Sequence, residues 1–115
     1  MSLTRHHAPA IPPAVSAWLA AHAMHDVDAE IAQFTDAVVV VDDGREYRGK
    51  DAARGWSANL SRDLEHTATI LRTDDQGDAV VATARVEGNF PGSPVVLRYQ
   101  FLLTGGLISA LTIAA

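Results

Sequence analysis

The chain has 115 residues, an ordinary length for one domain, and 48% of them are hydrophobic, which is enough to bury a core. Its 9 basic and 14 acidic residues give a formal net charge of −5, which argues against nucleic-acid and anionic-membrane partners because both require a basic face. The lack of cysteine excludes disulfides and thiolate chemistry. The apolar runs are too short for a signal peptide or a membrane span, so we expect a cytoplasmic protein.

The chain is expected to begin with a mobile leader over residues 1–12, followed by a single domain over residues 13–115. Proline is tolerated in the first turn of a helix, so Pro13 is a suitable helix start. The helical spacing of Val15, Trp18 and His22 then predicts a helix over residues 13–25.

A second, short helix is predicted over residues 28–34. Asp26 or Asp28 would cap its N-terminus, and Glu30 would lie in its first turn. The two helices would form a helical hairpin.

The next segment alternates between strand and helix signals. The β-branched run at 37–42 predicts a strand, Asp43-Gly44 a turn, and residues 45–48 a short return strand. Apolar residues at helical spacing predict a third helix over residues 51–61.

The rest of the chain carries strand signals. Alternating segments at 65–73, 79–87, 95–103 and 107–113 are separated by turn-forming residues, which predicts an antiparallel meander. Helices followed by such a meander predict an α+β fold in which the helices pack on one face of a strongly curved antiparallel sheet. The open mouth of this cone-shaped roll is a natural small-molecule pocket.

Three segments resemble the nuclear transport factor 2-like superfamily: residues 23–38, residues 47–56 and residues 101–108. The segment YRGKDAARGW resembles the superfamily stretch Y-x-G-x-x-A-I-x-x-W, and FLLTGGLI resembles its F-x-x-x-x-G-x-I ending. The chain is most similar to the SnoaL-like, polyketide cyclase-like branch, and more distantly to ketosteroid isomerase. The resemblance covers about residues 14–113 and implies the same cone-shaped fold.

The resemblance implies a catalytic site. Asp42 falls where ketosteroid isomerase has its general-base aspartate. The oxyanion-hole tyrosine of that enzyme matches Trp18, and its protonated aspartic acid matches Tyr99. Tyr99 can donate a hydrogen bond to an oxyanion. Structural alternatives remain: Asp42 as a turn residue, Trp18 as a core residue and Tyr99 as a half-buried strand tyrosine.

Further residues are candidates for the pocket wall. His22 follows Trp18 by one helical turn, and His66 opens a predicted strand, where it could act as an acid or base or be a satisfied half-buried histidine. Trp56 and Phe101 complete the candidate ligand-binding set. The sequence has no cysteine-based or HExxH metal pattern and no nucleotide-binding glycine motif, so we expect neither a metal nor a cofactor.

The leading hypothesis is a protein that binds a small, largely apolar carbonyl compound and transfers a proton, as an isomerase, cyclase or dehydratase. Asp42 would be the base and Tyr99 the oxyanion donor. The alternative is a non-catalytic dimeric binding or interaction module whose cone is packed by its own side chains. In both cases we expect a homodimer through the sheet, because Val96 and Leu102 point outward in the strand pattern.

Overall fold

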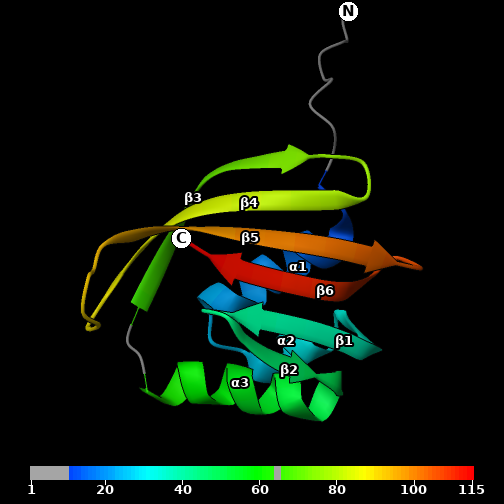
Figure 1. Ribbon diagram of the computed structural model, residues 1–115, viewed down its shortest axis with the longest axis horizontal. Coiled ribbons are helices and arrows are strands. Elements are labelled where there is room, and N and C mark those ends of the chain that lie inside the picture. Colours follow the sequence, from blue (N-terminus) through cyan, green and yellow to red (C-terminus); the bar gives the residue numbers. More distant parts are fainter. Residues whose placement is uncertain (1–10, 64–65) are drawn as a thin grey trace, which may run out of the picture.

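The computed structural model describes residues 11–63 and 66–115, so most of the predicted leader lies outside the described residues. The chain order is two helices, a hairpin, a third helix and four strands (Figure 1). The elements are α1 (Pro13–Ala23), α2 (Val27–Ile31), β1 (Phe34–Asp42), β2 (Arg45–Arg48), α3 (Gly49–Asp63), β3 (His66–Asp75), β4 (Ala79–Gly88), β5 (Val95–Thr104) and β6 (Leu107–Ala114). The predicted α+β class is confirmed. Within the described ranges, no helix combines the length and apolarity needed to cross a membrane.

The strands form one sheet in the order β2-β1-β6-β5-β4-β3. The predicted meander of the last four strands is confirmed, because each pairs antiparallel with the next. The prediction of a wholly antiparallel sheet is wrong at one place: β1 and β6 run parallel, with Val39 opposite Ala110. This pairing places the last strand between β1 and β5 and joins the hairpin to the meander.

The sheet bends around α1, and α3 lies along β1 and β2 at the other end of the fold (Figure 1). Register shifts in the β1–β6, β3–β4 and β5–β6 pairs contribute to the bend, because a bulge increases local twist. The concave face of the sheet and the helices enclose the core. Its largest fully buried apolar side chains are Trp18, Phe34, Phe101, Ile108 and Leu111.

The helical hairpin forms as predicted, but both helices are shorter. Helix α1 ends at Ala23, because His25 has a left-handed φ of 57°. Asp26 caps α2, its Oδ1 accepting a hydrogen bond from the Ala29 backbone N–H at 3.1 Å. The prediction that this helix extends to Phe34 is wrong, because Phe34 opens β1, where it is fully buried opposite Ile108.

The turn between β1 and β2 is as predicted. Asp43 and Gly44 have φ values of 53° and 78°, which are the left-handed conformations that a tight two-residue hairpin requires. Asp42 pairs with Arg45 across this turn. The turn therefore holds Asp42 at the last position of β1, next to the open end of the cone.

The buried position of Phe34 yields a stability prediction. Phe34→Ala should lower the free energy of unfolding by about 3–5 kcal/mol, because it leaves a cavity in the core. Chemical denaturation would measure the loss. Met24→Ala is the control: Met24 is 76% exposed, so the change should stay within about 0.5 kcal/mol. Equal effects of the two substitutions would contradict the placement of Phe34.

Candidate functional site

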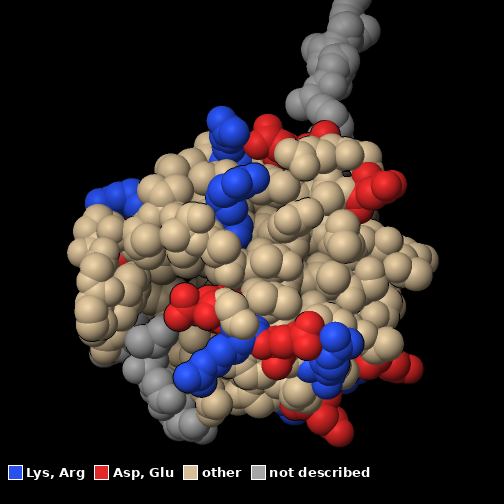
Figure 2. Space-filling view, viewed as in Figure 1, with Lys and Arg blue, Asp and Glu red and all other residues tan. Residues whose placement is uncertain are grey.

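The open end of the cone holds a cavity of about 440 Å³. Most of its wall is apolar, formed by side chains that include Leu60, Val86, Phe90, Val95, Leu97 and Ile113. These residues come from α3, from β4, β5 and β6, and from the connection between β4 and β5. The space-filling view shows a hollow beside acidic side chains at the left of the molecule (Figure 2). A cavity of this size and character suits a small, mainly apolar ligand.

Four of the predicted site residues line this cavity: His22, Asp42, His66 and Tyr99. They come from α1, β1, β3 and β5, elements that are far apart in the sequence. The fold therefore brings the predicted base and the predicted oxyanion donor to one cavity. Asp43, which follows Asp42 in the turn, also lines it.

The other three predicted ligand-binding residues, Trp18, Trp56 and Phe101, do not belong to the cavity wall. All three are buried in the core, with exposed fractions of 0%, 4% and 0%. Their large apolar rings gain more from complete burial than from a place at the open mouth. These aromatic residues form the floor on which the cavity rests.

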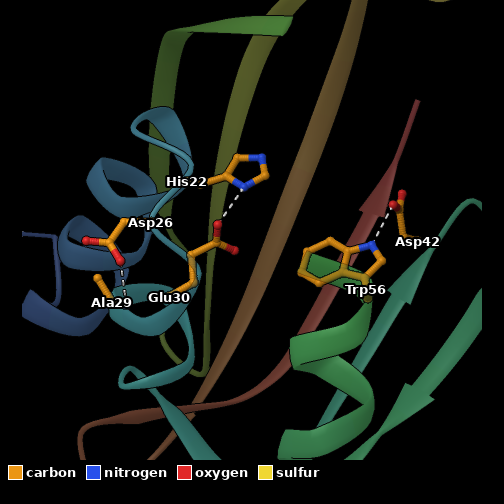
Figure 3. A network of polar contacts seen from close by, with 6 residues as sticks. All are labelled: His22, Asp26, Ala29, Glu30, Asp42 and Trp56. Atoms are coloured by element: carbon orange, nitrogen blue, oxygen red, sulfur yellow. Dashed lines mark hydrogen bonds and ion pairs between the residues drawn. The ribbon is translucent and has the colours of Figure 1, made fainter. Parts of the chain in front are cut away.

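Trp56 nevertheless contacts the site through Asp42. Its indole N–H donates a hydrogen bond to Asp42 Oδ2 over 2.9 Å (Figure 3). The bond engages one carboxylate oxygen and fixes the orientation of the side chain. Asp42 therefore bonds to α3 through its side chain, while its backbone ends β1 at the turn.

Tyr99 presents its hydroxyl in a nearly fully buried position, with 3% of the residue exposed. Burial, and then the negative charges of Asp42 and Glu30, raise the pKa of Tyr99 from 10.0 to about 12. Each of these causes disfavours the phenolate. The hydroxyl consequently stays protonated at neutral pH and can act as a hydrogen-bond donor.

His22 forms a buried polar contact that the sequence analysis did not predict. Its Nδ1 lies 3.3 Å from Oε2 of Glu30, and the Glu30 side chain is fully buried (Figure 3). The sequence placed Glu30 only as an acidic residue of a helical first turn. The predicted helical hairpin brings the two segments together, but the five residues of α2 are too few for their spacing to indicate which side faces α1.

The imidazole rings of His22 and His66 lie next to each other in the cavity wall. The ring centroids of His22 and His66 are 5.5 Å apart, and those of His22 and Tyr99 are 6.2 Å apart. The cavity thus has imidazoles on one side and the carboxylate of Asp42 on the other. Among residues 11–63 and 66–115, no three His, Cys, Asp or Glu side chains are placed to bind one metal ion.

The comparisons with known proteins agree with this architecture. A family profile described as SnoaL-like domain matches residues 15–105. A solved structure of a proposed polyketide cyclase from Sinorhizobium meliloti is 33% identical, with a TM-score of 0.86 over 90% of this chain and 95% of that chain. A search of functionally curated proteins gives no match.

Two more distant structures share the fold. One is a protein with a ketosteroid isomerase-like fold from Catenulispora acidiphila, solved with trimethylamine: 24% identity, TM-score 0.79, covering 92% of this chain and 87% of that one. The other is an epoxide hydrolase from Mycobacterium tuberculosis: 21% identity, TM-score 0.74, covering 89% and 79%. Because the family profile spans most of the domain, the chain belongs to the SnoaL-like domain family.

Proposed function

We propose that this protein binds a small, largely apolar carbonyl compound in the cavity and transfers a proton without a cofactor. Asp42 would remove a proton from the carbon next to the carbonyl, and Tyr99 would donate a hydrogen bond to the oxygen that becomes negative. The observation that carries this proposal is that Asp42 and Tyr99 line the same apolar cavity.

The surroundings of Asp42 suit a base. Asp42 lines the apolar cavity, where a carboxylate can take a proton from a bound carbon acid. The hydrogen bond from Trp56 holds it in place, so little reorganisation is needed at the moment of transfer.

The surroundings of Tyr99 suit an oxyanion donor. Its raised pKa keeps the hydroxyl proton in place, and burial removes competing water. The same negative charges that raise this pKa would repel an enolate, and the repulsion from Asp42 falls away once Asp42 has accepted the substrate proton. The charge that develops on the ligand thus replaces the charge that Asp42 loses.

The family adds support for this substrate class. The Sinorhizobium meliloti relative is a proposed polyketide cyclase, and polyketides carry carbonyl groups. The apolar wall agrees with a substrate whose remaining surface is hydrocarbon. The reaction would be an isomerisation, a cyclisation or a dehydration.

The alternative is a non-catalytic dimeric binding or interaction module. In its favour, the floor of the cone is packed by Trp18, Phe34 and Phe101, all fully buried. The open cavity above this floor favours a ligand-binding protein over a packed cone. The cytoplasmic location expected from the sequence stays a prediction.

We also propose that two copies associate through the outer face of the sheet. Leu71 and Val96 are about half exposed there, and together with Val81 and with polar residues that include Arg72, Asp74 and Arg98 they line a hollow of about 730 Å³. Leu102, on the same strand as Val96, is also exposed. Apolar side chains gathered on one sheet face are typical of a protein–protein contact.

The first prediction concerns Asp42 and is tested with phenols of graded acidity, which mimic an enolate. Binding to the wild type should be saturable when followed by the fluorescence of the two tryptophans, Trp18 and Trp56. Asp42→Asn should tighten the most acidic phenols by about tenfold, because it removes a negative charge beside the bound phenolate.

Asp43→Asn is the matched control for Asp42→Asn. Asp43 also lines the cavity, and asparagine tolerates its left-handed conformation. This variant should change phenol binding less than Asp42→Asn does, because Asp43 lies in the turn and it is Asp42 that the Trp56 N–H holds in place. If Asp42→Asn alters only stability, or if no phenol binds to the wild type, the proton-transfer function is wrong.

A second prediction concerns the Tyr99 hydroxyl. In a Tyr47→Phe background Tyr99 is the only tyrosine, and its ultraviolet titration should have a midpoint near pH 12. Adding Asp42→Asn should move the midpoint toward 10.0, because one of the charges that disfavours the phenolate is gone. An unchanged midpoint would show that Asp42 and Tyr99 do not interact.

The raised pKa of Tyr99 also predicts how the stability of the Tyr47→Phe variant changes at alkaline pH. The unfolded chain releases the Tyr99 proton near pH 10.0, and the folded chain releases it only near pH 12. The contribution of the protonated Tyr99 to the free energy of unfolding is therefore complete below pH 10.0 and is lost between pH 10.0 and about 12. The loss should be at most about 3 kcal/mol. Denaturant titrations across this range, compared with a Tyr47→Phe/Tyr99→Phe double variant, would isolate it.

A further prediction concerns the outer sheet face. Sedimentation equilibrium at micromolar concentration should give a dimer for the wild type and a monomer for Val96→Glu, because a charge would be buried in the contact. Met24→Glu is the control, since Met24 is highly exposed and lies between α1 and α2. A monomeric wild type would exclude this dimer.

A further inference from the structure

The buried pair of His22 and Glu30 transfers no proton in the function proposed so far. Glu30 is fully buried on the five-residue α2, and its Oε2 faces His22 Nδ1 at 3.3 Å. Carboxylates are rarely buried completely unless a partner compensates for the lost water. His22 is that partner, and its position on the cavity wall connects the buried carboxylate with the ligand space.

The orientation of the His22 ring is fixed on several sides. The Trp18 indole stacks on it with a centroid distance of 4.5 Å and an angle of 14°. Tyr99 packs against it edge to face, and Glu30 holds Nδ1. Figure 3 shows the second ring nitrogen directed away from Glu30. Nε2 is therefore the nitrogen available to a molecule in the cavity.

A histidine held in this way has acid–base chemistry. A proton on Nδ1 satisfies Glu30 and leaves a lone pair on Nε2, which makes Nε2 a base. When Nε2 takes up a proton, the Glu30 carboxylate stabilises the imidazolium that results. A carboxylate that orients a histidine in enzymes has this same effect.

The two polar pairs lie on opposite sides of the site. In Figure 3, His22 and Glu30 come from α1 and α2, and Asp42 and Trp56 come from β1 and α3, with strands of the sheet between them. An isomerisation needs only one group that removes a proton and returns it. Two separate acid–base groups instead match a reaction that removes one proton and donates another at a different atom.

We propose that the His22–Glu30 pair is a second acid–base group of this cavity, and that the substrate class is a carbonyl compound with a hydroxyl on its β-carbon. The inference rests on the proton-transfer function proposed above and selects elimination of water from its three reactions. His22 is the catalytic residue of the pair, because it faces the ligand, and Glu30 is the positioning residue.

The elimination breaks one carbon–hydrogen bond and one carbon–oxygen bond. Asp42 takes the proton from the α-carbon, and the electron pair of that bond forms the double bond between the α- and β-carbons. The bond between the β-carbon and oxygen breaks, and His22, which has taken up a solvent proton on Nε2 before the step, gives this proton to the departing hydroxyl, which leaves as water. Asp42 has then gained one proton and His22 has lost one, and exchange with solvent restores both.

The test is nitrogen NMR of the histidine rings of the full chain at about pH 8, where an ordinary histidine is neutral. His22→Gln identifies the His22 signals by their loss. In the free protein, Nδ1 should carry the proton and Nε2 should be unprotonated. Saturation with 4-nitrophenol, which is mainly the phenolate at this pH, should shift Nε2 of His22 to the protonated position, because the bound anion stabilises the imidazolium and the proton comes from solvent.

Glu30→Gln is the matched variant, since the amide keeps the shape and removes the charge. It should retain phenol binding but weaken it about tenfold or more, and Nε2 should no longer become protonated. Asp42→Asn should leave the His22 response intact. The wild-type spectra decide the question by themselves if Glu30→Gln does not fold.

The remaining outcomes separate the two proposals. If phenol binds and responds to Asp42→Asn while the His22 signals stay unchanged, or if His66 takes the proton instead, the inference about His22 is wrong and the proposed function stands. If no phenol binds to the wild type, the proposed function fails and the role of His22 fails with it.

Discussion

The packing of Trp18 at the floor of the cone is the constraint on which the rest of the site depends. This fully buried indole stacks on His22 and on Trp56, and it meets Tyr99 and Phe101 at steeper angles. From α1 it therefore contacts both α3 and β5. Because close-packed interiors transmit displacement, α1 cannot shift along the sheet without moving these neighbours. Trp18 thus fixes His22 and Tyr99 at the cavity and, through Trp56, supports Asp42.

Much of the fold could be predicted because its signals are local. The Asp43-Gly44 turn demands left-handed conformations that few other residue pairs adopt, so it set the end of β1. Along β5, strict alternation placed Tyr99 inward and Val96 outward, and the exposed fractions of 3% and 48% agree. The predicted pair of Asp42 and Tyr99 reached one cavity because the turn and the alternation fix their positions independently of one another.

The features that could not be predicted depend on contacts between distant segments. Phe34 has the spacing of a helical residue, but pairing with Ile108 draws it into β1, and the parallel contact of β1 with β6 has no local signal. Glu30 looks like an ordinary first-turn acid until α2 packs against α1. Trp56 was expected at the ligand, yet a large ring is most stable when buried, and its influence on the site passes through a hydrogen bond.

Unsatisfied polar atoms lie close to the His22 side of the site. Within the described residues, Trp18 Nε1 and Glu30 Oε1 are buried without a hydrogen-bond partner, and each such atom costs about 1–3 kcal/mol. Both belong to side chains that contact His22. Apolar side chains of similar volume often replace a buried ion pair without loss of stability, so packing alone gives no reason for a carboxylate at Glu30. A structure that retains such a destabilising group beside a cavity favours a chemical role for it, because strain and unsatisfied groups concentrate at functional sites.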